Sequence, residues 1–490
     1  MNFRRHYFAV LFPIAIAFLA GPAALRAQQT PASSAAATPA AASPNVDLDA
    51  LSQEMTGWLT DLIRINTTDP PGNELPAAKY IAAVLDKEGI ASEVIEVAPG
   101  RGIVVARLQA GSLPDSSQAL LLLGHLDVVG VDASGWSVDP FAAITRDGYL
   151  YGRGAIDDKG MVAANLAVFI AIKRSGMRLG RDLVFLADDD EEQGGDASIK
   201  PVIAKYWDKF ACTYALNEGG AVRMENGKVI YVSVQASEKV PYNVTVTAKG
   251  TSGHASRPLP DNAVVHLAAA IAKIGVFDAP PEPTAVTLRY FEGLAPIEED
   301  ETGKWMRAID EPERIELAMH HLGDANPAWG AMLHNTIVPT MLQAGVRTNV
   351  IPSAASANLN IRLMPGDSIY DVIGQLTKLV ADSQVTFALA PDPGENAPAS
   401  SLDSPLYKTI AKIAPQDFPG AVVVPELSTW ATDSAQLRLH NVQAFGVLPF
   451  PLADGDDARM HANDERVPLA SLRPGVAFLY HVVSSFVQAQ

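Results

Sequence analysis

Three short apolar segments of the chain end directly in a histidine or in acidic residues. They are residues 120–124 (LLLLG) before His125, residues 183–187 (LVFLA) before the acidic run 188–192, and residues 214–216 (YAL) before Asn217 and Glu218. Short continuous apolar segments bounded by polar residues are typical of buried parallel strands. Ligands bind outside the carboxyl ends of such strands, so a histidine and several acids gather at one edge of one sheet. Crowded carboxylates are costly to desolvate, and the pattern therefore predicts a metal site.

The N-terminus has the three parts of a secretory signal peptide. Arg4 and Arg5 precede an apolar stretch at residues 8–19, and small residues follow as far as Ala27, after which we expect cleavage. The alternative is a membrane anchor, but the apolar stretch is short for a bilayer span. Residues 28–47, rich in Ala and Pro, predict a disordered tether. We therefore expect an exported protein, periplasmic or secreted, that does not associate with the membrane after cleavage.

The rest of this 490-residue chain is too long for one ordinary core and predicts two domains. Residues 48–237 alternate helix-like and strand-like segments, as expected for a mostly parallel sheet flanked by helices. Residues 242–247 alternate apolar and polar side chains, which is typical of a half-exposed antiparallel strand. The α/β pattern returns at residues 393–490. We expect a discontinuous α/β domain interrupted by an α+β lid or dimerisation domain at residues 238–392.

The net charge of the chain limits its partners. The formal net charge is −18 at pH 7. A strongly acidic protein is repelled by nucleic acid and by anionic membranes. We therefore expect no nucleic-acid partner.

Several motifs occur in an order that resembles a known family. They are residues 125–129 (HLDVV), 152–160 (GRGAIDDKG), 191–195 (EEQGG), 217–220 (NEGG) and 460–465 (MHANDE). The chain resembles the co-catalytic zinc metallopeptidases, which include aminoacylase, carboxypeptidase G, carboxypeptidase S, succinyl-diaminopimelate desuccinylase and carnosinase. The resemblance extends from about residue 50 to the C-terminus. The NEGG motif and the long segment 275–333 are most similar to the carboxypeptidase S and N-acyl amino acid hydrolase branch.

This resemblance implies two zinc ions per chain, with Co²⁺ or Mn²⁺ as substitutes. It assigns Asp157 as the carboxylate that bridges the two ions. His125 and Glu218 would complete one site. Glu192 and His461 would complete the other. Nitrogen and oxygen ligands of this kind suit zinc and leave room for water.

The resemblance also implies roles for two residues beside the ligands. Glu191 would be the general base that takes a proton from water and gives it to the leaving amine. Asp127 would orient the imidazole of His125.

Each of these residues also has a structural interpretation. A single histidine after a strand is often structural, and the acidic run 188–192 could be a solvated loop or a helix N-terminus. Asp157 and Asp158 could cap the following helix. These interpretations leave unexplained why the acids all follow buried strands. Between the two aspartates, the family pattern favours Asp157 as the bridge.

Four further residues are assigned by the same resemblance. His254, in the segment 250–256 (GTSGHAS), would stabilise the oxyanion, often from the partner subunit in relatives. Left to itself, a histidine in such a loop is solvent-exposed. Arg362 would bind a substrate carboxylate, and Asn349 the same group or the oxyanion. Thr432 lies where relatives have a loop that contacts substrate.

Together these features predict an exported zinc-dependent amidohydrolase. It would cleave an amide bond beside a free carboxylate in N-acyl amino acids or short peptides, and it could form a homodimer through the inserted domain. A dipeptidase with the same chemistry is an alternative. Two further alternatives are a solute-binding protein, which would not need Glu191, and a dinuclear phosphoesterase.

Overall fold

The structure, a computed structural model, describes residues 46–111, 118–195, 199–298, 301–391 and 394–489. The predicted signal peptide and nearly all of the predicted tether lie outside these residues. Helix α1 (Leu48–Arg64) comes first. Asp47, the last residue of the predicted tether, caps it by accepting hydrogen bonds from the backbone N–H groups of Asp49 and Ala50. Among the described helices, none is long and apolar enough to cross a membrane.

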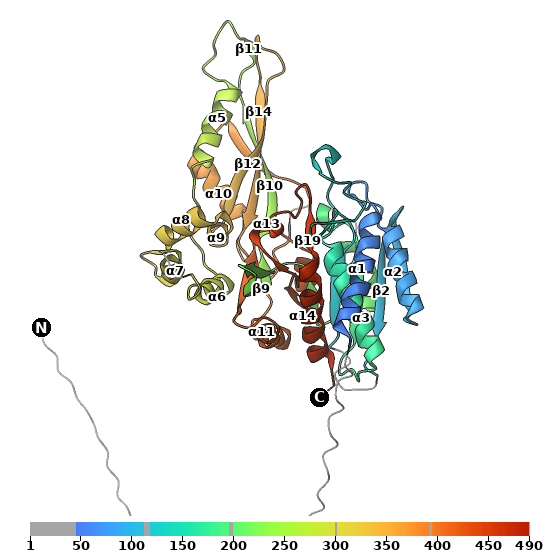
Figure 1. The fold of residues 1–490 in the computed structure, drawn as a ribbon. Coiled ribbons are helices and arrows are strands. Elements are labelled where there is room, and N and C mark those ends of the chain that lie inside the picture. The colour runs from blue at the N-terminus through green and yellow to red at the C-terminus, as the bar shows by residue number, and fades with distance from the viewer. Residues whose placement is uncertain (1–45, 112–117, 196–198, 299–300, 392–393, 490) are drawn as a thin grey trace, which may run out of the picture. The chain divides into compact units, whose positions relative to one another are not determined.

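The largest element is a ten-stranded mixed sheet (Figure 1). Its spatial order is β1 (Ser92–Ala98), β2 (Arg101–Leu108), β6 (Leu183–Asp188), β3 (Leu120–His125), β7 (Tyr214–Asn217), β17 (Gln443–Gly446), β9 (Lys228–Glu238), β8 (Ala221–Glu225) and β18 (Pro451–Leu452), with β16 (Val422–Ser428) also paired to β9. The central strands β6, β3, β7 and β17 are parallel. Antiparallel pairs occur toward the edges, as in β1 with β2 and β8 with β9. The α/β fold class is confirmed.

Both faces of this sheet are buried, which explains the continuous apolar strands. In β3, Leu120 and Leu122 belong to one core, whereas Leu121 and Leu123 belong to the core on the opposite face. The helices of the first core include α1, α2 (Leu75–Lys87), α3 (Lys159–Ser175), α11 (Pro405–Asp417) and α14 (Leu469–Val487). The second core is covered by α4 (Ile199–Phe210) and α12 (Ser434–Leu439).

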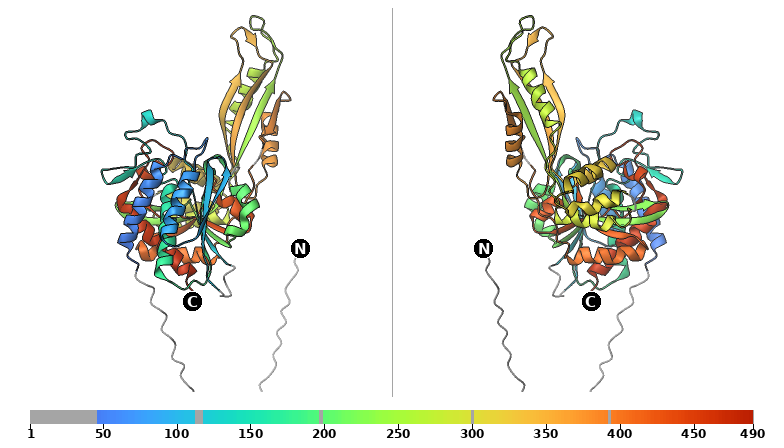
Figure 2. Two further views of the ribbon diagram at one scale, coloured as in Figure 1. Left: turned by 90° about the vertical axis from the view of Figure 1, so that its right-hand side faces the viewer. Right: turned by 90° about the vertical axis from the view of Figure 1, so that its left-hand side faces the viewer.

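A second sheet is antiparallel and covered by helices on one face only. Its order is β12 (Thr336–Ala344), β14 (Ala354–Leu363), β10 (Val240–Lys249) and β15 (Val385–Leu389). Helices α5 (Ala263–Ile274) and α10 (Ile369–Val380) share its apolar core, and Figure 2 gives two further views. Val244 and Val246 are buried while Asn243 and Thr245 are exposed, so the alternation in this segment has the predicted cause. A short ladder joins β11 (Gly253–His254) to β13 (Val350–Ile351).

The helices of the long segment 275–333 pack on the ten-stranded sheet. They are α6 (Ala285–Leu294), α7 (Glu301–Arg307), α8 (Ile315–Ala325) and α9 (Pro327–Ala331). Val286, Phe291 and Leu322 are buried in the same core as Val424 of β16. The described residues belong to one compact unit. The predicted bounds of the two domains therefore stay a prediction.

A small sheet connects the C-terminal part of the chain to the segment before α3. It consists of β19 (Arg466–Pro468), β5 (Tyr149–Tyr151) and β4 (Ile144–Arg146). The pairing of β19 with β5 brings the loop that follows α13 (Asp454–Asp457) next to the loop that precedes α3. Two of the predicted metal ligands lie on these loops.

Candidate metal centre

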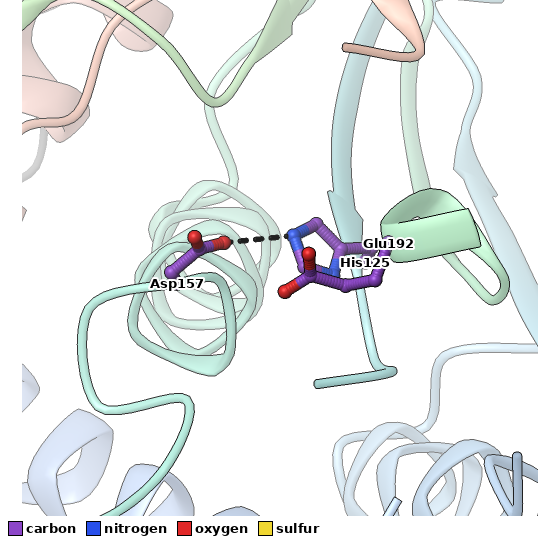
Figure 3. Close-up of side chains that lie close together, drawn as sticks. All are labelled: His125, Asp157 and Glu192. Carbon is purple, nitrogen blue, oxygen red and sulfur yellow. Dashed lines mark hydrogen bonds and ion pairs between the residues drawn. The ribbon is translucent and has the colours of Figure 1, made fainter. Parts of the chain in front are cut away.

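The ligands predicted from the sequence come from separate segments that meet at the carboxyl end of the parallel strands. They are His125 at the end of β3, Asp157 before α3, Glu192 in the short helix η2 (Glu191–Gln193) after β6, Glu218 after β7, and His461 in the loop before β19. Figure 3 shows three of them, His125, Asp157 and Glu192, facing one another. The expectation that the strand ends bring these side chains together is therefore met in the structure.

Asp157 has the geometry of a bridging carboxylate. Its Oδ1 lies 3.0 Å from Nε2 of His125, and its Oδ2 lies 3.0 Å from Nε2 of His461. Each carboxylate oxygen of Asp157 therefore lies next to a different histidine. Asp158 is directed elsewhere: it is buried, and its Oδ2 accepts a hydrogen bond of 3.2 Å from the backbone N–H of His125. Asp158 makes no side-chain capping bond to α3, so the geometry favours Asp157 as the bridge.

The remaining donors form two overlapping groups. Ligand atoms of His125, Asp157 and Glu192 lie within 4.8 Å of one another, and so do those of His125, Glu191 and Glu218. Nε2 of His125 is 3.9 Å from Glu218 Oε2 and 4.0 Å from Glu191 Oε2. The predicted base therefore lies among the ligands. Imidazole and carboxylate donors at this spacing could hold a metal ion.

The protonation of the cluster also fits a cation site. Burial raises the pKa of Glu218 to about 8, and it raises the pKa of Glu191 well above its ordinary value. Burial acts in the same direction on Asp157, but hydrogen bonds with His125 and His461 outweigh it and lower the pKa of Asp157. Hydrogen bonds to Asp157 and Glu192 raise the pKa of His461 to about 10. Groups this crowded retain protons that a metal ion displaces on binding.

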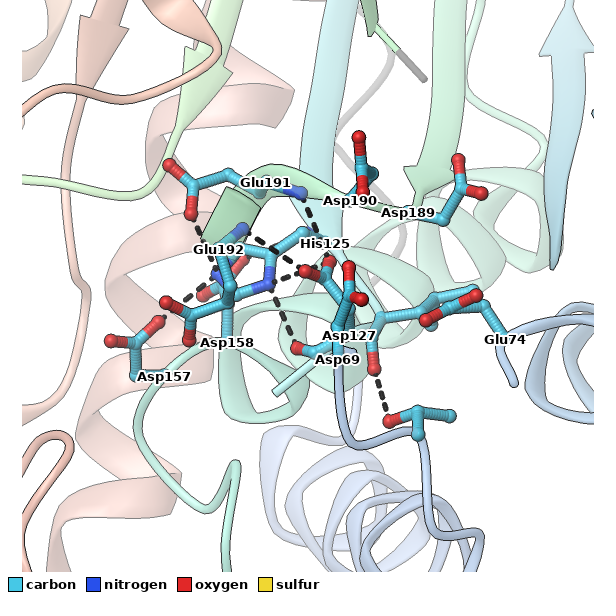
Figure 4. Close-up of polar contacts among 12 residues, drawn as sticks. Asp69, Glu74, His125, Asp127, Asp157, Asp158, Asp189, Asp190, Glu191 and Glu192 are labelled. Carbon is cyan, nitrogen blue, oxygen red and sulfur yellow. Dashed lines mark hydrogen bonds and ion pairs between the residues drawn. The ribbon is translucent and has the colours of Figure 1, made fainter. Parts of the chain in front are cut away.

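Asp127 has a wider structural role than orienting a histidine. Nδ1 of His125 lies 3.0 Å from the backbone oxygen of Asp127 and 3.4 Å from its Oδ1. The carboxylate of Asp127 also accepts hydrogen bonds from the backbone N–H groups of Glu191 (3.2 Å) and Glu192 (3.0 Å), as Figure 4 shows. The family resemblance implied that Asp127 orients His125, and the shorter of its two contacts with His125 is made by the backbone oxygen. The sequence did not indicate the contact with the turn after β6, which depends on how that turn folds back. Asp127 therefore holds both the imidazole of His125 and the turn that carries Glu191 and Glu192.

The acidic run after β6 is not a solvated loop. Asp188, Asp189 and Asp190 are buried, and only Glu191 and Glu192 are partly exposed. Arg101 of β2 pairs with two of the buried aspartates, Asp189 at 3.4 Å and Asp190 at 2.8 Å. The two glutamates at the end of the run line a cavity of about 660 Å³.

The same cavity is lined by Arg362 of β14. Arg362 is half-buried, and its Nε donates a hydrogen bond of 3.2 Å to Oδ1 of Asn360. Burial lowers the pKa of Arg362. Within the described part of the chain it forms no ion pair, so its terminal nitrogens have no carboxylate partner. Asp157, Glu191, Glu192, Glu218 and His461 line the cavity as well.

Thr432 also lines this cavity, but its hydroxyl is already used. It donates a hydrogen bond of 2.9 Å to Oε2 of Glu238. The same carboxylate pairs with Arg438 at 2.8 Å and accepts a hydrogen bond from Gln235 at 3.0 Å. Both Glu238 and Arg438 are buried. Sequence reasoning did not identify this buried ion pair, because neither residue lies in a recognisable motif.

His254 and Asn349 do not line the cavity. Both are exposed, and they lie together where the backbone N–H of Ala255 donates to the backbone oxygen of Asn349. Nδ1 of His254 is 2.8 Å from the hydroxyl oxygen of Ser256. Figure 1 shows β11, which carries His254, at the end of the four-stranded sheet that is distant from β9. Within one chain, the structure does not bring these two residues to the ligand cluster.

Comparisons with known proteins agree with this geometry. Residues 121–485 match the family described as "Peptidase family M20/M25/M40". A probable carboxypeptidase S-like protein of Dictyostelium discoideum is 29% identical over 388 residues, covering 76% of this chain and 72% of the relative. The human N-fatty-acyl-amino acid synthase/hydrolase is 28% identical over 390 residues, covering 76% and 75%. The crystal structure of an M20 family metallo-carboxypeptidase from Sulfolobus solfataricus superposes with a TM-score of 0.67 at 19% identity, covering 88% of this chain and 99% of the other. The chain therefore belongs to peptidase family M20/M25/M40, a family of metal-dependent amidohydrolases and peptidases.

Proposed function

We propose that this protein is an exported, dinuclear zinc hydrolase that cleaves an amide bond next to a free carboxylate. N-acyl amino acids are the proposed substrates, with short peptides as the alternative that would make it a dipeptidase. One observation carries the proposal. A single cavity is lined by the histidine and carboxylate cluster and by Arg362, which has no ion-pair partner among the described residues. A substrate with a scissile amide and a carboxylate matches both parts.

The side chains divide the reaction between them. When bound, two zinc ions supply a water of lowered pKa and stabilise charge on the carbonyl oxygen. Glu191 takes the proton of the attacking water and delivers it to the nitrogen of the leaving amine. Its position beside the ligands, 4.0 Å from Nε2 of His125, supports this role. Asp127 holds the backbone of Glu191, so the base keeps its direction during proton transfer.

The carboxylate preference provides the test of this function. Arg362→Ala should raise KM for an N-acyl amino acid roughly 10- to 100-fold, because a hydrogen bond to a charged group contributes about 1.5–3 kcal/mol. The variant should also lose the preference for the free acid over its amide. Lys378→Ala, an exposed change on α10, is the control. An Arg362→Ala enzyme that still prefers the free acid would contradict the assignment. Comparing N-acyl amino acids with unblocked dipeptides separates aminoacylase from dipeptidase.

His254 would act in the site of a partner subunit. β12 is an edge strand of the four-stranded sheet, and Val338, Met341 and Leu342 on it are exposed by 52%, 58% and 64%. An edge strand of this kind pairs readily with another strand, which supports a homodimer through this sheet. His254→Ala should lower kcat. Mixing inactive His254→Ala and Glu191→Gln chains should restore activity, and mixtures that exchange subunits yet stay inactive would exclude this arrangement.

A further inference from the structure

The buried pair of Arg153 and Glu465 connects the two loops that carry Asp157 and His461. The two residues are 312 positions apart in the chain, and their side chains are exposed by only 2% and 0%. Neither side chain is a ligand. Both nevertheless contact the backbone of ligand-bearing loops, and this makes them candidates for positioning the metal site.

Glu465 holds the loop before α3. Its Oε1 accepts hydrogen bonds from the backbone N–H groups of Ile156 (2.9 Å) and Asp157 (3.2 Å). Its Oε2 accepts one from the backbone N–H of Gly154 (3.1 Å) and one from Nη1 of Arg153 (2.5 Å). Four hydrogen bonds occupy the lone pairs of a carboxylate, so Glu465 has no capacity left to bind a metal. Its effect on the site passes through the backbone of Asp157.

Arg153 holds the other loop. Its Nη2 donates hydrogen bonds to the backbone oxygens of His461 (3.1 Å) and Ala462 (3.2 Å). The guanidinium also lies 5.3 Å from the ring centre of Trp136, which restricts its rotation. His461 has a positive φ of 61°, a conformation that a residue with a Cβ atom adopts only when contacts hold it. The hydrogen bond to the His461 carbonyl is such a contact.

We infer that the Arg153–Glu465 pair is a positioning device that sets the spacing between Asp157 and His461, and with it the affinity of the metal site that these two share with Glu192. The inference rests on the proposed dinuclear function. Because the pair has no net charge, its attraction for a cation is small, and it acts mainly through geometry. The site formed by His125 and Glu218 shares Asp157 but has no other contact with the pair, so it should be affected less.

The chain offers a matched control pair. Arg107 donates to Asp182 Oδ2 (2.9 Å) and to the backbone oxygens of Lys209 (3.4 Å) and Ala211 (3.1 Å), and Asp182 accepts from the backbone N–H of Ala110. The hydrogen-bond pattern resembles that of Arg153 and Glu465, but the two side chains are more exposed, by 23% and 14%, and they join segments without ligands. Variants of the control pair test how much of any effect is general loss of stability.

The experiment measures zinc binding rather than turnover. Glu465→Gln and Arg153→Lys are compared with Asp182→Asn, Arg107→Lys and the unmodified chain by equilibrium dialysis against a zinc chelator, with circular dichroism to verify folding. Glu465→Gln keeps the shape of the side chain but places an amide group against two donors. We expect Glu465→Gln and Arg153→Lys to lower the affinity for one of the two zinc ions roughly 10- to 100-fold, as is typical for partners of metal ligands. The affinity for the other zinc ion should change little. The control variants should bind both equivalents normally.

The outcomes separate this inference from the proposed function. An unmodified chain that binds fewer than two zinc ions would contradict the dinuclear function and the inference with it. Normal binding of two ions by the unmodified chain, together with normal affinity in folded Glu465→Gln, would overturn the inference alone. The inference would also be overturned if Glu465→Gln lowered the affinity for both zinc ions equally and Asp182→Asn did the same. If Glu465→Gln does not fold, Arg153→Lys, which keeps the charge, decides between these results.

Discussion

Two groups of carboxylates lie side by side at the end of the sheet (Figure 4). They pair with different kinds of cationic group. The first, which we call the Arg101 cluster, surrounds one guanidinium. Its carboxylates and their distances to Arg101 are Asp69 (2.7 Å), Glu74 (3.3 Å), Asp189 (3.4 Å) and Asp190 (2.8 Å). The second, the ligand cluster, contains Asp157, Glu191, Glu192 and Glu218, whose ion pairs among the described residues are formed with His125 and His461.

The boundary between the two clusters lies between Asp190 and Glu191, which are adjacent in the chain. Arg101 is permanently charged, so the protein itself supplies a fixed cation to the first cluster, one positive charge among four carboxylates. A histidine can release its proton and bind a metal with the same nitrogen, so the ligand cluster can accept a cation from solution. Burying carboxylates without a permanent charge is costly. The difference supports the proposal that only the second cluster is a metal site.

The largest expected effect of this difference is on activity after metal removal. A chelator should abolish turnover, and two equivalents of zinc should restore it, because the ligand cluster depends on cations. The fold should persist, since the Arg101 cluster has its own cation. Turnover and circular dichroism of the same chelated sample test both statements. Full activity after chelation, or no gain from the second equivalent, would contradict the dinuclear mechanism.

A change at Glu191, the predicted general base within the ligand cluster, should have the next largest effect. Glu191→Gln should lower kcat by about 10²- to 10⁴-fold, because general-base help is lost, while both metals stay bound. Glu192→Gln should instead weaken metal binding, since Glu192 lies 3.1 Å from Nε2 of His461. Turnover and metal content are measured on both variants. Near-normal turnover of Glu191→Gln would require a different base.

The Arg101 cluster should affect stability rather than metal binding. Arg101→Met leaves several buried carboxylates without their cation, and removing one partner of a buried pair costs about 3–5 kcal/mol. We expect a lower urea midpoint for unfolding, with or without zinc. Lys304→Met removes an exposed pair with Glu301 and should change stability by about 0–1 kcal/mol. An Arg101→Met chain as stable as the control would refute the distinction between the clusters.

The predictable part of the structure follows from local patterns. Leu51, Met55 and Leu59 recur at helical spacing, and all three are buried on one face of α1. His125 and Glu218 could be placed together because parallel strands end at the same edge. In both cases the cause acts over a few residues or through a general rule of sheet topology.

The unpredicted part depends on contacts between distant segments. Arg153 and Glu465 meet across 312 positions, and no periodicity links them. The packing of α6 against β16 also joins distant segments, and the sequence pattern did not predict it. The contact of Asp127 with the N–H of Glu191 depends on a turn in which Asp190 has a positive φ of 67°. Candidate ligands could therefore be named from the sequence, whereas the contacts that support them could not.

The smallest expected effect is a difference in proton release. The raised pKa values of Glu218 (about 8) and His461 (about 10) mean that both groups hold protons at pH 7 when no metal is bound. Zinc needs the unprotonated atoms, so binding should release protons, and zinc affinity should rise as pH rises toward 8. Burial raises the pKa of Glu74 to about 7 as well. Glu74 belongs to the Arg101 cluster, which should not lose protons when zinc binds. Calorimetric titration in two buffers of different ionisation enthalpy at pH 7 measures the protons released. If zinc binding releases protons from the unmodified chain and fewer from His461→Ala, the result would support Glu218 and His461 as ligands. Zinc binding without any proton release would show that these two groups are not the ligands.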